Sequence, residues 1–272
     1  MSKVWFITGT SRGLGRAFAE SALERGDKVA ATARNVSSLD ELVTKYGEGA
    51  VLPLPLDVTD KAAVAAAVSA AHEKFGRLDV VVNNAGYGLF GMVEEITEQQ
   101  LRDQIETNLF GAFWVSQAVL PIMRAQGDGH IVQISSVGGI AAFPSLGAYH
   151  ASKWALEGFS EALAQEVAGA GIKVTIVEPG GFATDWGGSS GAHTDPIPAY
   201  DQVREALAAR FGEARYAESA DAAAALLHIV DAANPPLRVF FGIEPAEVVQ
   251  PLYAQRLQTW ADWEHVSRIA QG

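Results

Sequence analysis

The chain has 272 residues, 49% of them hydrophobic, which suits one large α/β domain or two small ones with a sizeable core. Its formal net charge of −12 argues against a nucleic-acid-binding surface, because such a surface needs clustered Lys and Arg to neutralise phosphates. It contains no cysteine, which excludes disulfides, thiol catalysis and Cys-ligated zinc.

The first apolar segment, Val4–Ile7, is too short for a signal-peptide core or a membrane span, and no later apolar run reaches membrane length. We therefore expect a cytoplasmic protein that neither crosses a membrane nor binds nucleic acid.

Short apolar segments alternate with helical patterns along the chain. The expected strands are Val4–Ile7, Lys28–Thr32, Ala50–Leu56, Val80–Val82, His130–Ile134, Lys173–Val177 and Arg238–Phe241. The expected helices include Gly13–Arg25, Lys61–Phe75, Glu98–Ala125 and Ala148–Ala170. Continuous apolar strands between helices are typical of a parallel sheet covered on both faces. We predict one domain over residues 1–272, an α/β fold with a doubly wound parallel β-sheet of about seven strands.

Two regions depart from this alternation. Residues 185–200 are rich in Gly, Ser and Pro, and long irregular connections of this kind often serve as lids over a site. We predict a substrate loop or lid over residues 185–215. The tail over residues 244–269 has a helical pattern, and we expect Leu252, Leu257, Trp260 and Trp263 to be its buried residues.

A glycine-rich turn follows the first strand and leads into a helix. Gly9, Gly13 and Gly15 allow a tight turn and a close approach of the backbone to a pyrophosphate. The first N–H groups of the helix supply positive potential at the same point. Because the turn follows a strand and precedes a helix, we predict that it binds a dinucleotide.

A tyrosine and a lysine stand four residues apart in a later helical pattern. Tyr149 and Lys153 therefore project from one helix face, where the ammonium can approach the phenol. A nearby cation favours the phenolate, so we expect a lowered pKa for Tyr149, as general acid–base catalysis requires. Ser136 lies 13 residues before the tyrosine.

These motifs, in this order, resemble the short-chain dehydrogenase/reductase family. The similarity covers roughly Val4 to Phe241 and includes T-G-x-x-x-G-x-G at 8–15, N-N-A-G at 83–86 and P-G-x-x-x-T at 179–184. It implies a Rossmann fold and a nicotinamide coenzyme. The cofactor-binding residues that it implies are Gly9, Ser11, Arg12, Gly13, Leu14, Gly15, Arg34, Asp57, Val58, Asn84, Ala85, Gly86, Tyr149, Lys153, Pro179, Gly180, Phe182 and Thr184.

The resemblance also assigns catalytic roles. Tyr149 would protonate the alkoxide that forms as hydride arrives, and Lys153 would bind the nicotinamide ribose. Ser136, rather than Ser135, would hold the substrate oxygen. Asn108 matches the asparagine that holds a water linked to the lysine.

The end of the second strand predicts the coenzyme. NAD-binding folds place an acid about 20 residues beyond the glycines, where it bonds the ribose 2′-hydroxyl. Ala33 stands at that position and Arg34 follows it, while Arg12 and Ser11 lie in the glycine turn. Two guanidiniums can grip a 2′-phosphate, so we predict NADP(H).

Loops at the carboxyl ends of the strands predict the substrate. Their aromatic and apolar residues favour a small hydrophobic ketone, aldehyde or alcohol. The predicted substrate-binding residues are Tyr87, Phe90, Val137, Phe143 and Trp186. The tail resembles the 17β-hydroxysteroid and retinol dehydrogenase-like branch of the family, a likeness that does not identify a substrate.

Other interpretations stay open. The same scaffold can serve a lyase or epimerase, or a non-catalytic protein that senses NADP. The histidines show no metal-binding spacing, so we expect no catalytic metal, and we interpret His150 as non-catalytic. A homodimer or homotetramer could use an apolar face with Phe110, Phe113 and Trp114.

Overall fold

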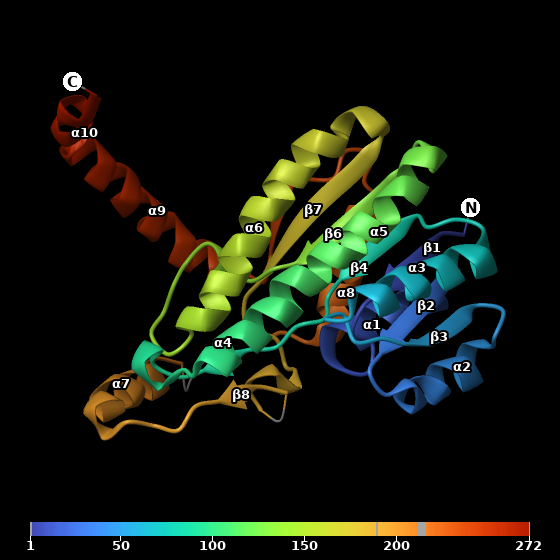
Figure 1. The fold of residues 1–272 in the computed structure, drawn as a ribbon, viewed down its shortest axis with the longest axis horizontal. Helices are drawn as coiled ribbons and strands as arrows, with labels where there is room; N and C mark the ends of the chain where they lie inside the picture. The colour runs from blue at the N-terminus through green and yellow to red at the C-terminus, as the bar shows by residue number, and fades with distance from the viewer. Residues whose placement is uncertain (1, 189, 212–215, 272) are drawn as a thin grey trace.

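The computed structural model describes residues 2–188, 190–211 and 216–271 (Figure 1). Residues 189 and 212–215 of the predicted lid, and the two terminal residues of the predicted domain, lie outside the described residues.

A parallel sheet of seven strands forms the centre of the molecule (Figure 1). Its strands are β1 (Val4–Ile7), β2 (Lys28–Ala33), β3 (Val51–Pro55), β4 (Val80–Asn83), β6 (Gly129–Ile134), β7 (Ile172–Pro179) and β9 (Arg238–Phe241). They lie in the order β3-β2-β1-β4-β6-β7-β9, so the chain reverses its direction of winding between β1 and β4. This is the predicted Rossmann-like α/β fold, and such a reversal opens a ligand crevice at the carboxyl ends of the strands.

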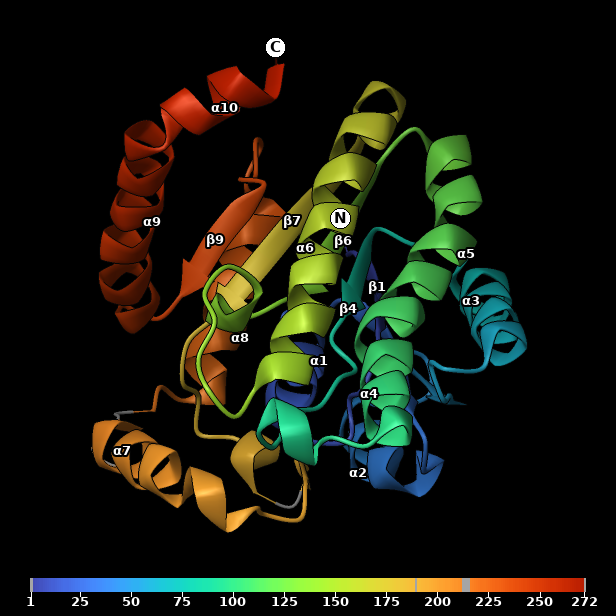
Figure 2. The same cartoon turned by 60° about the vertical axis from the view of Figure 1, so that its left-hand side comes forward.

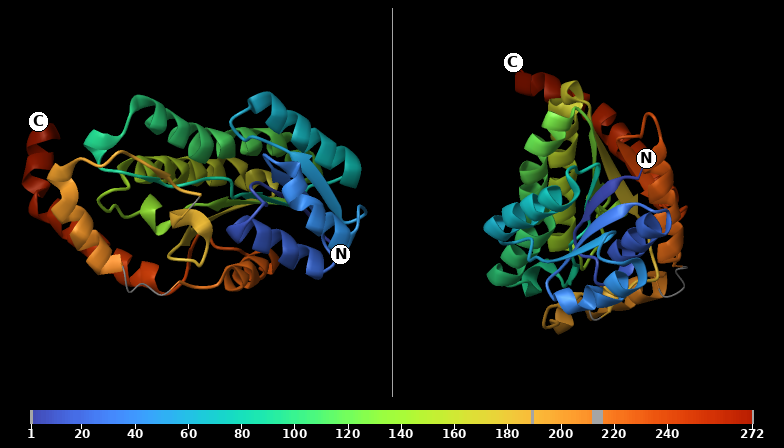
Figure 3. Two further views of the ribbon diagram at one scale, coloured as in Figure 1. Left: turned by 90° about the horizontal axis from the view of Figure 1, so that it is seen from below. Right: turned by 90° about the vertical axis from the view of Figure 1, so that its right-hand side faces the viewer.

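Helices cover both faces of the sheet (Figure 3). Trp5 and Ile7 pack toward α1 (Gly13–Glu24), α2 (Asp40–Tyr46) and α8 (Ser219–Asp231). Val4 and Phe6 point to the opposite face, toward α3 (Lys61–Phe75), α5 (Gly111–Gln126) and α6 (Gly147–Val167). Because side chains alternate along a strand, a strand buried on both faces must be apolar throughout.

The predicted helix Glu98–Ala125 is interrupted. It consists of α4 (Glu98–Ile105), a π-helical turn over Glu106–Phe110, and α5. The turn contains Asn108, whose side chain is buried. Single π-turns inside helices often occur at functional sites, because they redirect one side chain.

The predicted lid is more ordered than its composition indicates. β8 (Ala192–His193) pairs in parallel with β5 (Leu89–Phe90), and α7 (Asp201–Phe211) follows. Glu95 holds the segment: its carboxylate accepts hydrogen bonds from Ile197 N (2.7 Å) and the Thr194 hydroxyl (3.0 Å) and forms an ion pair with Arg204. The backbone N–H of Ile197 lowers the pKa of Glu95 to about 2, so this anchor is ionised at neutral pH.

The expected burial of the tail is wrong. The tail forms α9 (Glu244–Asp262) and α10 (Glu264–Gln271), which extend away from the sheet in Figure 1, while Figure 2 shows α9 beside the β9 edge. Leu252 is half-buried, but Leu257, Trp260 and Trp263 are 62%, 69% and 61% exposed. Among the described residues, no helix is long and apolar enough to cross a membrane.

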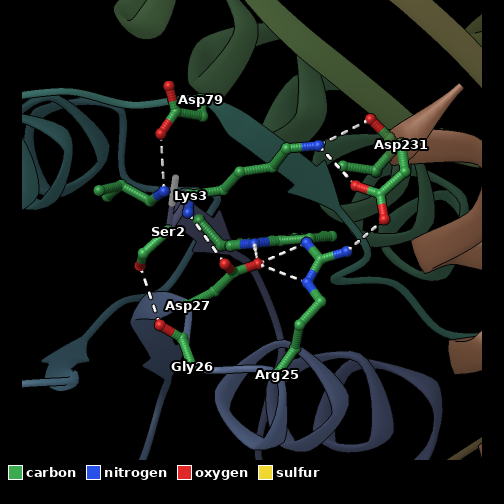
Figure 4. A network of polar contacts seen from close by, with 10 residues as sticks. Ser2, Lys3, Arg25, Gly26, Asp27, Asp79 and Asp231 are labelled. Carbon is green, nitrogen blue, oxygen red and sulfur yellow. Dashed lines mark hydrogen bonds and ion pairs between the residues drawn. The ribbon is translucent and has the colours of Figure 1, made fainter. Parts of the chain in front are cut away.

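Polar contacts tie the amino end of the sheet together, opposite the crevice (Figure 4). Asp27 accepts hydrogen bonds from Trp5 Nε1 (2.8 Å) and Lys3 N (2.9 Å), and it pairs with Arg25. Arg25 and Lys3 both pair with Asp231 at the end of α8, at 2.8 and 2.7 Å. These contacts join β1 and β2 to α8 and lie away from the site described below.

Candidate active site

The glycine turn is shaped by contacts between the ends of β1 and β4. Gly9 and Gly13 have φ of +71° and +59°, a region that favours glycine. A Cβ on Gly15 would lie 2.2 Å from the Gly9 carbonyl oxygen, so a side chain there is excluded. Asn84 Nδ2 donates to the carbonyls of Thr8 (2.9 Å) and Gly9 (3.0 Å), which fixes the turn.

The amino end of α1 faces this turn without a side-chain cap. Its first N–H groups are therefore available to an anion, and the helix dipole adds positive potential there. Leu14 and Phe182 pack against the core beside the turn. The loop after β7 reaches the same place, since a Cβ on Gly13 would lie 3.6 Å from Thr184 Cγ2.

The other predicted coenzyme contacts surround this crevice. Asp57 accepts hydrogen bonds from the backbone N (3.0 Å) and hydroxyl (2.8 Å) of Thr59, and Val58 is buried beside Gly111. Ala33 is buried and Arg34 is exposed. Arg12 is also exposed and forms an ion pair of 3.0 Å with Asp185 in the predicted lid. The remaining predicted contacts lie at or just after the carboxyl ends of β1, β4 and β7: Ser11, Ala85, Gly86, Pro179 and Gly180.

Tyr149 and Lys153 lie side by side on the buried face of α6, each 5% exposed. Lys153 Nζ is 5.9 Å from the centroid of the Tyr149 ring and donates a 2.7 Å hydrogen bond to the Ile134 carbonyl. Ser136 lies after β6 and hydrogen-bonds to the Tyr149 phenol. Ser135 points elsewhere, because its hydroxyl lies beside Gly139 and Glu157. The geometry thus favours Ser136 over Ser135 as the tyrosine's partner.

The expected lowering of the tyrosine pKa is not found. Burial raises the pKa of Tyr149 to about 12, and the hydrogen bond with Ser136 opposes this only in part. Burial lowers the pKa of Lys153 to about 8, while the nearby Glu157 carboxylate raises it. The effect of burial on the Tyr149 pKa is larger than that of the Lys153 cation, because the ammonium donates its hydrogen bond to the Ile134 carbonyl and not to the phenol. At neutral pH the phenol therefore carries its proton and can donate it.

Asn108 positions the loop after β4. Its side-chain oxygen accepts from Tyr87 N (3.1 Å), and its Nδ2 donates to Tyr87 O and Ser152 Oγ, both at 3.0 Å. Gly86 permits this approach, since a Cβ there would lie 2.9 Å from Asn108 Oδ1 and 3.7 Å from Lys153 Nζ. The side chain thus joins the Tyr87 loop to α6, and its predicted water-mediated role stays a prediction.

An aromatic wall stands over the phenol. The Trp186 ring lies 5.0 Å from that of Tyr149, in an edge-on arrangement. Phe90 lies 5.0 Å from Trp186, and His193 stacks on Phe90 at 5.1 Å. Trp186 thus contacts the predicted proton donor directly, and Phe90 and His193 extend the ring cluster behind it. Two members of the predicted substrate set, Phe90 and Trp186, belong to this wall.

His150 holds the loop that carries the other side of the site. One ring nitrogen hydrogen-bonds to Gly138 O and the other accepts from Phe143 N, both at 2.9 Å. It therefore positions the loop with Val137 and Phe143, which fits a structural role. Sequence reasoning missed Gln104, which is buried and links Leu89 N (2.8 Å) to Tyr87 O (2.9 Å). A lone glutamine in a helical pattern gives no signal of such a role.

These groups thus gather at the carboxyl ends of the parallel strands, with the glycine turn after β1 and the buried Tyr149 phenol, the predicted proton donor, after β6. Residues 3–195 match the family model described as short chain dehydrogenase. The chain belongs to the short-chain dehydrogenase family. The glycine turn, the uncapped helix and the Tyr149–Lys153 pair all lie within the matched region.

Relatives and solved structures in this family cover almost the whole chain. Oxidoreductase BOA17 of Botryotinia fuckeliana is 48% identical over 91% of each chain. The 3-ketodihydrosphingosine reductase of Bacteroides thetaiotaomicron is 36% identical over 93% of this chain and 91% of its own. A short-chain dehydrogenase structure from Streptomyces avermitilis has a TM-score of 0.93 at 40% identity, over 99% and 98% of the two chains.

Other short-chain dehydrogenase structures contain either nicotinamide coenzyme. One from Burkholderia cenocepacia, in complex with NADP, has a TM-score of 0.76 at 27% identity over 96% and 97% of the two chains. A 3-ketoacyl-(acyl-carrier-protein) reductase from Brucella melitensis, complexed with NADH, has a TM-score of 0.76 at 25% identity over 88% and 96%. The side-chain-free cradle at Gly15 fits the pyrophosphate of such a nicotinamide dinucleotide.

Proposed function

We propose that this protein is an NADP(H)-dependent oxidoreductase that interconverts hydrophobic ketones or aldehydes and their alcohols, with Tyr149 as general acid and base. The observation that carries the proposal is the buried Tyr149 phenol, which hydrogen-bonds to Ser136 and lies 5.0 Å from the Trp186 ring. Cytoplasmic location and the steroid and retinol branch of the family stay predictions from sequence.

When bound, the coenzyme supplies or accepts the hydride at its nicotinamide ring. In the reducing direction, the Tyr149 phenol gives its proton to the substrate oxygen as the carbonyl carbon gains the hydride. The Ser136 hydroxyl orients that oxygen. The Lys153 ammonium, held by Ile134 O, stabilises the phenolate that remains until solvent returns the proton. In the oxidising direction, the Tyr149 phenolate accepts the proton of the alcohol.

The aromatic wall supports a hydrophobic substrate. The Trp186 ring lies beside the phenol and packs against Phe90, and the loop that carries Phe143 is held by His150. A site of this composition binds apolar groups and leaves recognition of one carbonyl oxygen to Tyr149 and Ser136. The relative named as a 3-ketodihydrosphingosine reductase agrees with a keto substrate.

The end of β2 supports NADP(H). Ala33 places no carboxylate where a ribose 2′-phosphate would lie, and Arg34 is exposed beside it. Arg12 reaches the same crevice from the glycine turn, where its present partner is Asp185. A bound 2′-phosphate would compete with Asp185 for that guanidinium, so cofactor binding and lid position would be coupled.

We expect Arg34→Asp to reverse the coenzyme preference. Loss of a charge-assisted bond of roughly 1.5–3 kcal/mol should raise the KM for NADPH about 10- to 100-fold, and the new carboxylate should repel the phosphate. Steady-state kinetics with NADPH and NADH measure this. Arg124→Asp, at the far end of α5, is the matched control. An unchanged ratio of the two KM values would refute the assignment of Arg34.

We also expect carbonyl reduction to decline above about pH 8. The pKa of Lys153 is lowered to about 8, so its ammonium is lost within a range where an ordinary lysine stays charged. The Tyr149 phenol keeps its proton there, because its pKa is about 12. A pH profile of kcat/KM with NADPH tests this, and activity that stays constant to pH values well above 9 would contradict the role of Lys153.

A further inference from the structure

An apolar ridge follows the tail beyond the body of the protein. We define the tail ridge as six exposed residues spaced by three or four positions: Tyr253, Leu257, Trp260, Trp263, Val266 and Ile269. Spacing of this kind places Tyr253, Leu257 and Trp260 on one face of α9. The exposed fractions of these six side chains run from 39% to 76%, so the described chain leaves the ridge largely uncovered. Figure 1 shows that α9 and α10 extend away from the sheet.

Only the first part of the tail is attached to the body. Pro245 and Val249 are buried, and the Arg256 guanidinium lies 5.0 Å above the Trp154 ring and donates to Ile140 O (3.1 Å). Every described side chain after Arg256 is exposed. α10 has eight residues, and isolated helices shorter than about 12–15 residues are marginal in water, because most helical stability comes from packing an apolar face. A partner surface would supply that packing for the exposed end of the tail.

The charge of the ridge selects among partners. Residues 253–271 contain two arginines and two carboxylates, so the segment is formally neutral, and the net charge of −12 belongs to the rest of the chain. Arg268 is already paired with Glu264 at 2.6 Å. Helices that bind membrane surfaces present an excess of Lys and Arg to anionic lipids, which this tail does not. A strongly charged protein partner would find no complementary charge here either.

We propose that the tail is a self-association surface, in which the tail ridge of one chain packs against the tail ridge of a second copy. A two-fold pair brings neutral, apolar faces together and keeps the two acidic bodies apart. The four tryptophans of such a pair would remove roughly 600 Å² or more from water, a large part of the ~1,200 Å² of a specific interface. This surface is separate from the active site and from the α5 face, where Phe110 and Phe113 are partly exposed.

Sedimentation equilibrium of the full chain tests the proposal. We expect wild type to form a species of twice the 28.8 kDa chain mass. Trp260→Glu should weaken its association about thirtyfold, as expected for a central aromatic contact. Gln255→Glu adds the same charge on the opposite face of α9 and should leave association unchanged. Circular dichroism and NADPH binding of each variant establish that the body stays folded.

Four results would overturn the proposal. Wild type could be monomeric throughout the micromolar range, or Trp260→Glu could associate as tightly as Gln255→Glu. Association lost in Phe113→Glu but kept in Trp260→Glu would assign the interface to α5. A monomer that co-sediments with phosphatidylcholine vesicles through Trp260 would assign the ridge to a membrane surface instead.

Discussion

Tyr149→Phe should lower kcat for carbonyl reduction about 10²- to 10⁴-fold while NADPH binds almost as in wild type. The substitution removes one oxygen from a buried ring and leaves its packing against Trp186 intact. The alkoxide that forms would then have no proton donor. Ser136 could still hydrogen-bond to the substrate oxygen, but its hydroxyl is a far weaker acid than a phenol.

Absorbance of NADPH, followed with a panel of hydrophobic ketones and aldehydes, measures this loss. Tyr46→Phe is the matched control, because the Tyr46 hydroxyl donates a 3.1 Å hydrogen bond to Glu24 at the surface. NADPH affinity, measured by fluorescence, separates lost chemistry from lost binding. If Tyr149→Phe turned over as fast as Tyr46→Phe, another group would be the proton donor.

Arg238→Leu should destabilise the fold by about 3 kcal/mol. Arg238 on β9 pairs with Glu178 on β7 at 2.6 Å, with Glu161 on α6 at 2.9 Å, and with Glu157 on α6. Glu157 and Glu178 are almost fully buried. Removal of their shared cation leaves uncompensated charge inside the protein. We take the lower end of the usual range because the Arg238 side chain is 32% exposed.

Urea unfolding measures this change, and pH provides a second readout. Burial raises the pKa of Glu178 to about 7 and also raises that of Glu157, while Arg238 lowers both. Without Arg238 both pKa values rise further, so both carboxyls are protonated at low pH. The destabilisation should therefore be largest near pH 8 and should shrink toward pH 5. Arg102→Leu, which breaks only an exposed pair with Glu98, should stay within about 0.5 kcal/mol of wild type. Equal effects of the two substitutions would contradict the account of the cluster.

Much of the fold could be predicted because the sheet is buried on both faces. The predicted bounds of β1, β9 and α3 agree with the structure. Short apolar runs predict the two strands, and the four-residue spacing of Val64 and Val68 in an Ala-rich segment predicts the helix. β7 continues two residues beyond its predicted end. Glu178 lies in this extension. A carboxylate normally indicates the end of a buried strand, and the sequence does not show that Arg238 on β9 pairs with this one.

The candidate site was predictable where motifs are local and unpredictable where contacts are distant. Tyr149 and Lys153 share one helix face, so their proximity follows from their spacing. The contact of Trp186 with Tyr149 and the ion pair of Arg12 with Asp185 depend on how the segment after β7 folds back over the ends of the strands. The pKa of Tyr149 was predicted in the wrong direction, because spacing gives the neighbour but not the burial.

The tail shows a further limit of periodicity. The spacing of Leu257 and Trp260 predicts an apolar helix face, and the structure has that helix. The spacing of apolar residues does not show whether the same chain or a second molecule covers the helix face. The expected burial in the core was wrong for that reason.

Transfer of deuterium from labelled coenzyme tests the central claim most directly. NADPH with deuterium at both C4 positions of the nicotinamide would be incubated with the protein and a hydrophobic ketone. We predict an alcohol with one deuterium on its carbinol carbon, formed by wild type and almost absent with Tyr149→Phe. Tight NADPH binding with no labelled alcohol from any hydrophobic carbonyl would contradict the proposed chemistry and would favour an NADP-sensing protein.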